Sequence, residues 1–243
     1  MAARLLPPGG AEGFHVIRFD NRDVGQSQRY AGGSYGLGAF ADDTAALLDG
    51  LGLDSAHIVG QSMGGMITLE LAALHPERVR SLGLVYTTAS LAHAKGRDLI
   101  DERMAVAAPG TRDEFLSYYP ASEAGCVSPA YPQDTAWLTE VAGDIWDRGW
   151  DLEGPERQLQ ALLGWAGRVD ELSSIAVPTT ILAGDGDQLI DWAASVELHE
   201  KIPGSALTIF PGMGHELPEP LWDDIAGLLG ANARAAETAR PLR

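Results

Sequence analysis

The chain has 243 residues, 45% of them apolar and 21% charged, which is ordinary usage for one sizeable globular domain. Its 17 basic and 34 acidic residues give a net charge of −17, which argues against nucleic acids and anionic membranes, because Lys and Arg bind phosphate groups. The single cysteine, Cys126, excludes an internal disulfide framework and a multi-cysteine metal site.

The N-terminal stretch MAARLLPPGGAEG lacks the apolar core of a secretion signal. No segment approaches the roughly 18–20 consecutive apolar residues that a membrane span needs. The sequence therefore predicts a cytoplasmic location without a membrane partner.

Short apolar runs alternate with helical patterns along the chain. Strands are expected at residues 15–19, 56–60, 81–86, 179–184 and 206–210. Helices are expected at residues 37–51, 63–75, 191–202 and 220–237. This alternation favours an α/β protein with a mainly parallel sheet covered by helices on both faces.

Residues 88–174 interrupt this alternation. Their pattern is helical, and they contain four of the six tryptophans, Trp137, Trp146, Trp150 and Trp165. An insertion of helices between the third and fourth strands predicts a lid, which divides the chain into a first core part (1–87), the lid (88–174) and a second core part (175–243). The tryptophans would mostly pack the lid itself, with one or two left to line a pocket.

The stretch from Gly60 to Gly64, GQSMG, carries the G-x-S-x-G pattern between an expected strand and an expected helix. In that setting Ser62 would occupy a sharp, strained turn, and side chains at 60 or 64 would clash with the crossing chain. The turn would lift the Ser62 hydroxyl clear of the sheet and leave the Met63 N–H at a helix N-terminus, where an oxyanion could form.

A serine nucleophile needs a base, and histidine serves best near neutral pH. Of the six histidines, only His215 follows a strand in a Gly- and Pro-rich loop, FPGMGHELPEP, that can carry a side chain to the sheet's carboxyl edge. The others are expected to have packing, surface or helix-end roles: His15, His57, His75, His93 and His199.

The acid should lie between serine and histidine in chain order. The segment LAGDGDQLID, after the fourth strand, offers three aspartates. Asp187 is the preferred acid, to orient the imidazole. Asp185 as a loop brace and Asp191 as a helix N-cap remain the alternatives.

These motifs resemble the α/β-hydrolase family over nearly the whole chain, from GFHVIRFDNRDVGQS through GQSMGG and VPTTILAGDGDQLI to IFPGMGHELP. Within the family, DNRDVGQS, RGWDLEGPERQLQALL and PGMGH are most similar to esterases of the aclacinomycin methylesterase type, and more distantly to proline iminopeptidases and cofactor-free haloperoxidases. The resemblance implies Ser62 as nucleophile, Asp187 as acid, His215 as base and the Met63 N–H as an oxyanion donor. It implies that Asp20, Arg22 and Asp23 hold their loop.

One departure concerns the N-terminus. Members of the family begin with three further strands, and the third ends in a His-Gly loop that gives the second oxyanion donor. Here residues 15–19 resemble the fourth strand, so the fold is expected to be N-terminally shortened. A single donor predicts weak esterase activity, and an uncovered strand edge would let copies of the chain associate.

The sequence thus predicts a serine hydrolase that cleaves an ester of a small organic molecule, with no cofactor or metal implied. Two alternatives stay open. One is a non-hydrolytic binding protein, cyclase or lyase that keeps the pocket, and the other is a haloperoxidase- or perhydrolase-like activity of the same triad.

Overall fold

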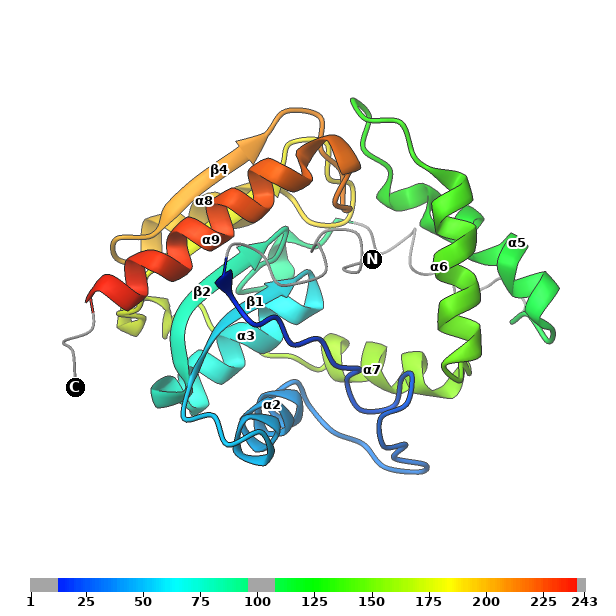
Figure 1. Ribbon diagram of the computed structural model, residues 1–243, viewed down its shortest axis with the longest axis horizontal. Coiled ribbons are helices and arrows are strands. Elements are labelled where there is room, and N and C mark those ends of the chain that lie inside the picture. Colours follow the sequence, from blue (N-terminus) through cyan, green and yellow to red (C-terminus); the bar gives the residue numbers. More distant parts are fainter. Residues whose placement is uncertain (1–12, 96–107, 240–243) are drawn as a thin grey trace.

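The computed structural model describes residues 13–95 and 108–239. Within these residues four parallel strands form one sheet in the order β1–β2–β3–β4 (Figure 1). They are β1 (Ala56–Gln61), β2 (Val79–Val85), β3 (Thr179–Gly184) and β4 (Ala206–Phe210). Because parallel strands all end at the same edge, the loops after β1, β3 and β4 can meet there. The predicted α/β class is confirmed.

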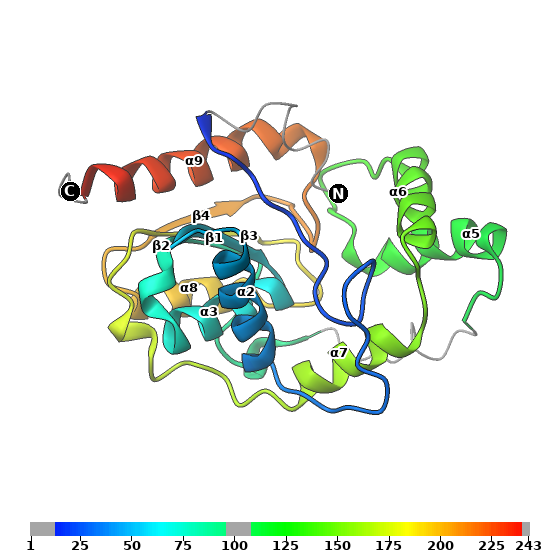
Figure 2. The same cartoon turned by 60° about the horizontal axis from the view of Figure 1, so that its bottom comes forward.

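Helices cover both faces of the sheet. On one face lie α2 (Gly38–Gly50), α3 (Met63–Leu74) and α8 (Ala193–Lys201), and on the other lies α9 (Trp222–Ala239) (Figure 2). Alternate strand residues serve the two layers: Ile181 packs in a cluster with residues of α3 and α8, whereas Leu182 packs with Ile225 of α9. This two-sided burial explains why the strands read as nearly continuous apolar runs.

Short 3₁₀ turns connect these elements. They are η2 (Pro76–Arg78), η3 (Leu91–His93), η4 (Glu123–Cys126), η5 (Leu172–Ser174) and η6 (Glu219–Leu221). No helix within the described ranges is both long and apolar enough to cross a bilayer.

The segment between β2 and β3 is largely helical. It contains α5 (Arg112–Ser122), α6 (Thr135–Asp147) and α7 (Glu153–Leu163), and α5 and α6 stand to one side of the sheet (Figure 1). Buried Phe115 forms the centre of their packing, with Trp146 and Trp150 ring centroids 5.6 and 4.7 Å away. Part of the expected lid, residues 96–107, lies outside the described residues.

The prediction of a strand at residues 15–19 is wrong. This stretch belongs to no strand, and its apolar side chains Val16, Ile17 and Phe19 are exposed. β1 pairs with β2 alone among the described strands, and Val59 on β1 is 55% exposed. An apolar run becomes a strand only where a neighbour satisfies its backbone N–H and C=O groups, and residues 15–19 join no such ladder here.

Candidate active site

The turn between β1 and α3 holds Ser62 in an unusual backbone conformation. Its φ of 52° and ψ of −126° lie outside the regions that non-glycine residues prefer. The surrounding structure holds this strain, because the Ser62 N–H donates to the Val85 carbonyl at 3.0 Å and the Thr87 hydroxyl donates to the Ser62 carbonyl at 2.7 Å. The side chain is therefore presented at the carboxyl edge of the sheet.

Two glycines make this turn possible. A Cβ at Gly60 would overlap the carbonyl of Gly64, and a Cβ at Gly65 would lie 2.5 Å from side-chain atoms of Thr87. At Gly64 itself a Cβ would meet nothing within 4 Å. The expected clash at position 64 is therefore wrong. Gly65, which the five-residue pattern does not include, is the second position that requires a glycine.

The loops after β3 and β4 bring an acid and a base to Ser62. The His215 Nε2 lies 2.7 Å from the Ser62 hydroxyl, and its Nδ1 lies 2.8 Å from Asp187 Oδ2. A neutral imidazole that donates from Nδ1 to the carboxylate leaves Nε2 free to accept the serine proton. The three residues, called here the first trio, form one continuous hydrogen-bonded chain.

Asp187 is held rigidly. Its side chain is buried, and Oδ1 accepts the backbone N–H groups of Leu189 and Ile190 at 2.8 and 3.0 Å. The other oxygen, Oδ2, is thereby directed at His215. Such a fixed carboxylate orients the imidazole and stabilises it when it becomes charged.

The two alternative aspartates have other contacts. Asp185 accepts the Gly212 N–H at 2.5 Å and so ties the loop after β3 to the loop after β4. Asp191 pairs with the Lys95 ammonium at 2.7 Å, which lowers the pKa of that carboxyl, and accepts the Ala193 N–H at the start of α8. These contacts match the bracing and capping roles considered for them.

Four other histidines lie away from Ser62. They bond to Ser81 (His57), Asp42 (His75), Glu197 (His93) and Ser205 (His199). His15 is exposed in the segment before the first described strand. The structure therefore brings only His215 of these six to the Ser62 hydroxyl.

Sequence reasoning missed the residues that support His215. The ring of buried Tyr86 lies 4.6 Å from the His215 ring, and its hydroxyl donates to Gln61 Oε1 at 2.6 Å. Burial raises the pKa of Tyr86 well above its usual value, so the phenol stays neutral. No sequence signal marks Tyr86, because its role depends on where β2 happens to end beside the loop after β4.

A second support comes from the helical insertion. The Ser128 hydroxyl accepts the Gly214 N–H at 2.8 Å, and Glu216 accepts the Ser128 N–H at 2.7 Å. A Cβ at Gly214 would overlap the Val127 carbonyl, so the glycine allows this close approach. Ser128 of the insertion thus bonds to the loop after β4 on both sides of His215, at Gly214 and at Glu216.

A cavity of about 250 Å³ opens between α6 and the chain that follows His215. Its walls include Trp137 and Leu138 of α6 and Trp222 at the start of α9. Among the described residues, no group of three or more His, Cys, Asp or Glu side chains is arranged to hold a metal ion.

Known proteins resemble this chain in sequence and in fold. The profile of the family described as "alpha/beta hydrolase fold" matches residues 2–219. The chain is 30% identical over 210 residues to "Putative carbamate hydrolase RutD" of Variovorax paradoxus, covering 84% of this chain and 75% of the relative. It is 29% identical over 259 residues to rhodomycin D methylesterase DnrP of Streptomyces peucetius, covering 93% and 83%.

A solved structure shares the fold. The esterase EaEST of Exiguobacterium antarcticum superimposes with a TM-score of 0.63 at 21% identity, over 90% of this chain and 80% of that one.

Proposed function

Because this chain belongs to the α/β hydrolase family, we propose that it is a serine hydrolase that cleaves an ester of a small organic molecule through an acyl-enzyme. The observation that carries the proposal is the unbroken chain of hydrogen bonds from Ser62 through His215 to Asp187, with 2.7 and 2.8 Å between the bonded atoms. These distances are within the reach that proton transfer requires. The similarity to a methylesterase supports an ester as the substrate.

In the first half of the reaction the Ser62 hydroxyl attacks the ester carbonyl while His215 Nε2 takes its proton. The imidazolium that forms is stabilised by Asp187, and it then protonates the departing alcohol. In the second half His215 takes a proton from water, and the resulting hydroxide attacks the acyl-enzyme carbonyl. The bond between the acyl group and the Ser62 oxygen then breaks, which releases the carboxylic acid, and His215 returns its proton to the Ser62 oxygen. No cofactor enters this scheme.

Charge on the carbonyl oxygen needs hydrogen-bond donors. Met63 is the first residue of α3, so its N–H lies outside the helical hydrogen-bond ladder and at the positive end of the helix. We assign it as one oxyanion donor. A site working with this donor alone would lose about 10²–10³ in rate relative to a site with two.

The helical insertion, residues 88–174, would act as the lid. Two observations support this role. Residues of α7 and Met63 pack in or against the same apolar cluster, and Ser128 bonds to Gly214 in the loop that carries His215.

The proposal is tested by labelling the protein with a fluorophosphonate and by measuring turnover of p-nitrophenyl acetate. The wild type should be labelled and should hydrolyse the ester, and Ser62→Ala should do neither. Ser81→Ala, which removes a buried serine hydroxyl elsewhere in the sheet, is the matched control and should keep both properties. Absence of labelling in the folded wild type would favour a non-hydrolytic binding protein or lyase.

The V. paradoxus relative, named for carbamate hydrolysis, favours a second candidate substrate class. The same serine could attack a carbamate carbonyl. An acetate ester and an N-methylcarbamate of the same phenol separate the two classes, since faster turnover of the carbamate would reassign the substrate. Adding hydrogen peroxide and bromide to the assay tests the haloperoxidase alternative, which predicts a halogenated product.

A further inference from the structure

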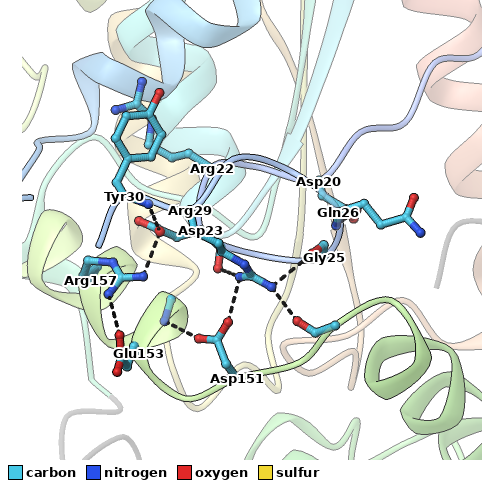
Figure 3. Close-up of polar contacts among 12 residues, drawn as sticks. Asp20, Arg22, Asp23, Gly25, Gln26, Arg29, Tyr30, Asp151, Glu153 and Arg157 are labelled. Carbon is cyan, nitrogen blue, oxygen red and sulfur yellow. Dashed lines mark hydrogen bonds and ion pairs between the residues drawn. The ribbon is translucent and has the colours of Figure 1, made fainter. Parts of the chain in front are cut away.

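The loop of residues 20–30 is tied to the lid helix α7 by a buried ion pair. Asp23 has no exposed surface, and its carboxylate accepts from the Arg157 guanidinium at 2.8 Å (Figure 3). It also accepts the Tyr30 N–H at 2.7 Å and the Tyr35 hydroxyl at 2.5 Å. Three donors, one of them from a distant part of the chain, therefore converge on one buried charge.

The backbone at Asp23 is also unusual. Its φ of 71° lies in the left-handed region, which few non-glycine residues occupy. A buried charge at a strained position persists only where the surrounding contacts favour that conformation. Arg157 is 134 residues away from Asp23 in the sequence. Its contact therefore links the loop to a distant segment, and does not merely close the loop on itself.

Further contacts join the same two segments. The Gln158 side chain donates to the Arg22 carbonyl at 2.7 Å, and Arg29 pairs with Asp151 at 3.1 Å. A Cβ at Gly154 would overlap the Asp23 carbonyl oxygen, so the first turn of α7 lies directly against the loop. The position of α7 is thus set by this loop as well as by its own packing.

Helix α7 and the residue after Ser62 meet the same apolar cluster. Ala161 of α7 belongs to this cluster, and Leu162 of α7 and Met63 pack against it. Tyr35, which donates to Asp23, packs against the same cluster. Asp23 is therefore connected to the site both through α7 and through Tyr35.

We propose that Asp23 and Arg157 are positioning residues that hold α7 as a wall of the substrate pocket and so determine how well bulky esters bind. This proposal rests on the proposed serine hydrolase function. A small ester contacts the wall little and depends mainly on the first trio. A bulky ester depends on the wall, and a displaced α7 weakens its binding without changing the chemistry at Ser62.

The test compares wild type with Asp23→Asn, Arg157→Gln and the double variant on p-nitrophenyl acetate and on p-nitrophenyl 1-naphthoate. Fluorophosphonate titration counts active sites, so that misfolded protein does not enter the rates. Each single variant should raise KM for the naphthoate about tenfold and leave kcat for the acetate unchanged. The double variant should match the single variants, because they break one interaction.

Glu153→Gln is the matched control, since it removes the exposed partner of Arg157 and leaves Asp23 paired; it should behave as wild type. If a single variant fails to fold, Arg157→Lys keeps the charge without the guanidinium geometry and should give a smaller rise in KM. Equal losses on both esters per active site, or additive effects in the double variant, would overturn the proposal.

Hydrogen exchange gives a readout that does not depend on ester hydrolysis. Asp23→Asn should speed exchange in α7 and leave α8 unchanged. Faster exchange in α7 without any ester turnover by the wild type would refute the proposed function but keep the ion pair's positioning role. Unchanged exchange in α7 would refute that role.

Discussion

Two Ser–His–carboxylate chains lie at opposite edges of the same sheet. The first trio at the carboxyl edge has a counterpart at the amino edge, called here the second trio. In the second trio the His57 Nδ1 lies 2.9 Å from the Ser81 hydroxyl, and the His57 Nε2 lies 3.1 Å from Glu237. The two sets differ little in residue type or distance, so these properties alone do not identify a catalytic site.

The difference lies in the backbone and in exposure. Ser81 is 2% exposed and sits within the β1–β2 ladder, directly paired with His57, so no substrate can reach its hydroxyl. Ser62 follows the end of β1 on a left-handed turn at a helix N-terminus. The exposure of the acids is the reverse of that of the serines. Asp187, in the first trio, is buried and accepts two backbone N–H groups, whereas the Glu237 side chain, in the second trio, is 46% exposed and also pairs with Arg80.

The largest expected effect separates the two histidines. His215→Ala should lower kcat for an aryl ester by about 10⁶, the loss typical of removing one member of a serine triad. His57→Ala should leave kcat per active site unchanged, because Ser81 is enclosed in the sheet. Steady-state kinetics, with circular dichroism to check folding, measure both. A comparable loss of kcat in the folded His57 variant would break the distinction.

The acids should differ next. Asp187→Asn should reduce kcat by about 10⁴, because the amide favours the wrong imidazole tautomer. Glu237→Gln should have no effect on kcat, since it removes a carboxylate at the protein surface. Steady-state kinetics of the two folded variants measure this difference, and similar kcat values for both would break the comparison between the acids.

A buried carboxylate, Asp23, and an exposed one, Glu237, should also differ in how their contribution to folding stability depends on pH. The hydrogen bond from Arg157 holds the pKa of Asp23 well below its usual range. Its stabilising contribution is therefore complete above the ordinary carboxyl pKa of about 4 and is lost as pH falls toward the lower folded-state value. At pH 7 Asp23→Asn should cost roughly 3 kcal/mol in the free energy of unfolding, and this difference should shrink below about pH 4.

Urea titrations of both proteins at several pH values measure this difference. Glu237→Gln is the control, because an exposed pair contributes about 0–1 kcal/mol at any pH. A stability difference for the Asp23 variant that grew as pH fell would contradict the assignment.

The smallest expected effects concern the turn between β1 and α3 that carries Ser62. Ser81, which lies inside β2, has no such turn. Gly60→Ala should destabilise the fold by about 1–3 kcal/mol, because its Cβ would overlap the Gly64 carbonyl. Gly64→Ala should change stability by less than about 0.5 kcal/mol, since open space surrounds that position. Thermal unfolding measures both. Equal destabilisation would show that the turn is not limited by the contact at Gly60.

Local pattern was enough to predict much of this protein. The strands at 56–60, 179–184 and 206–210 form within about one residue of their expected bounds, because buried parallel strands need unbroken apolar runs. The first trio could also be proposed from sequence, since each member follows a strand and all parallel strands end at one edge.

Other features depended on neighbours that no local pattern reveals. Residues 15–19 have the composition of a strand, but strand formation requires a hydrogen-bonding partner, and the described chain provides none beside them. Likewise Tyr86 supports His215, and Arg157 reaches Asp23, only because segments distant in sequence meet in the fold. Sequence by itself determined the four strands of the sheet and the catalytic candidates, since these follow from short-range periodicity and chain order. The tertiary structure decided which Ser–His pair is accessible and which loop contacts α7, because burial and long-range contacts exist only after packing.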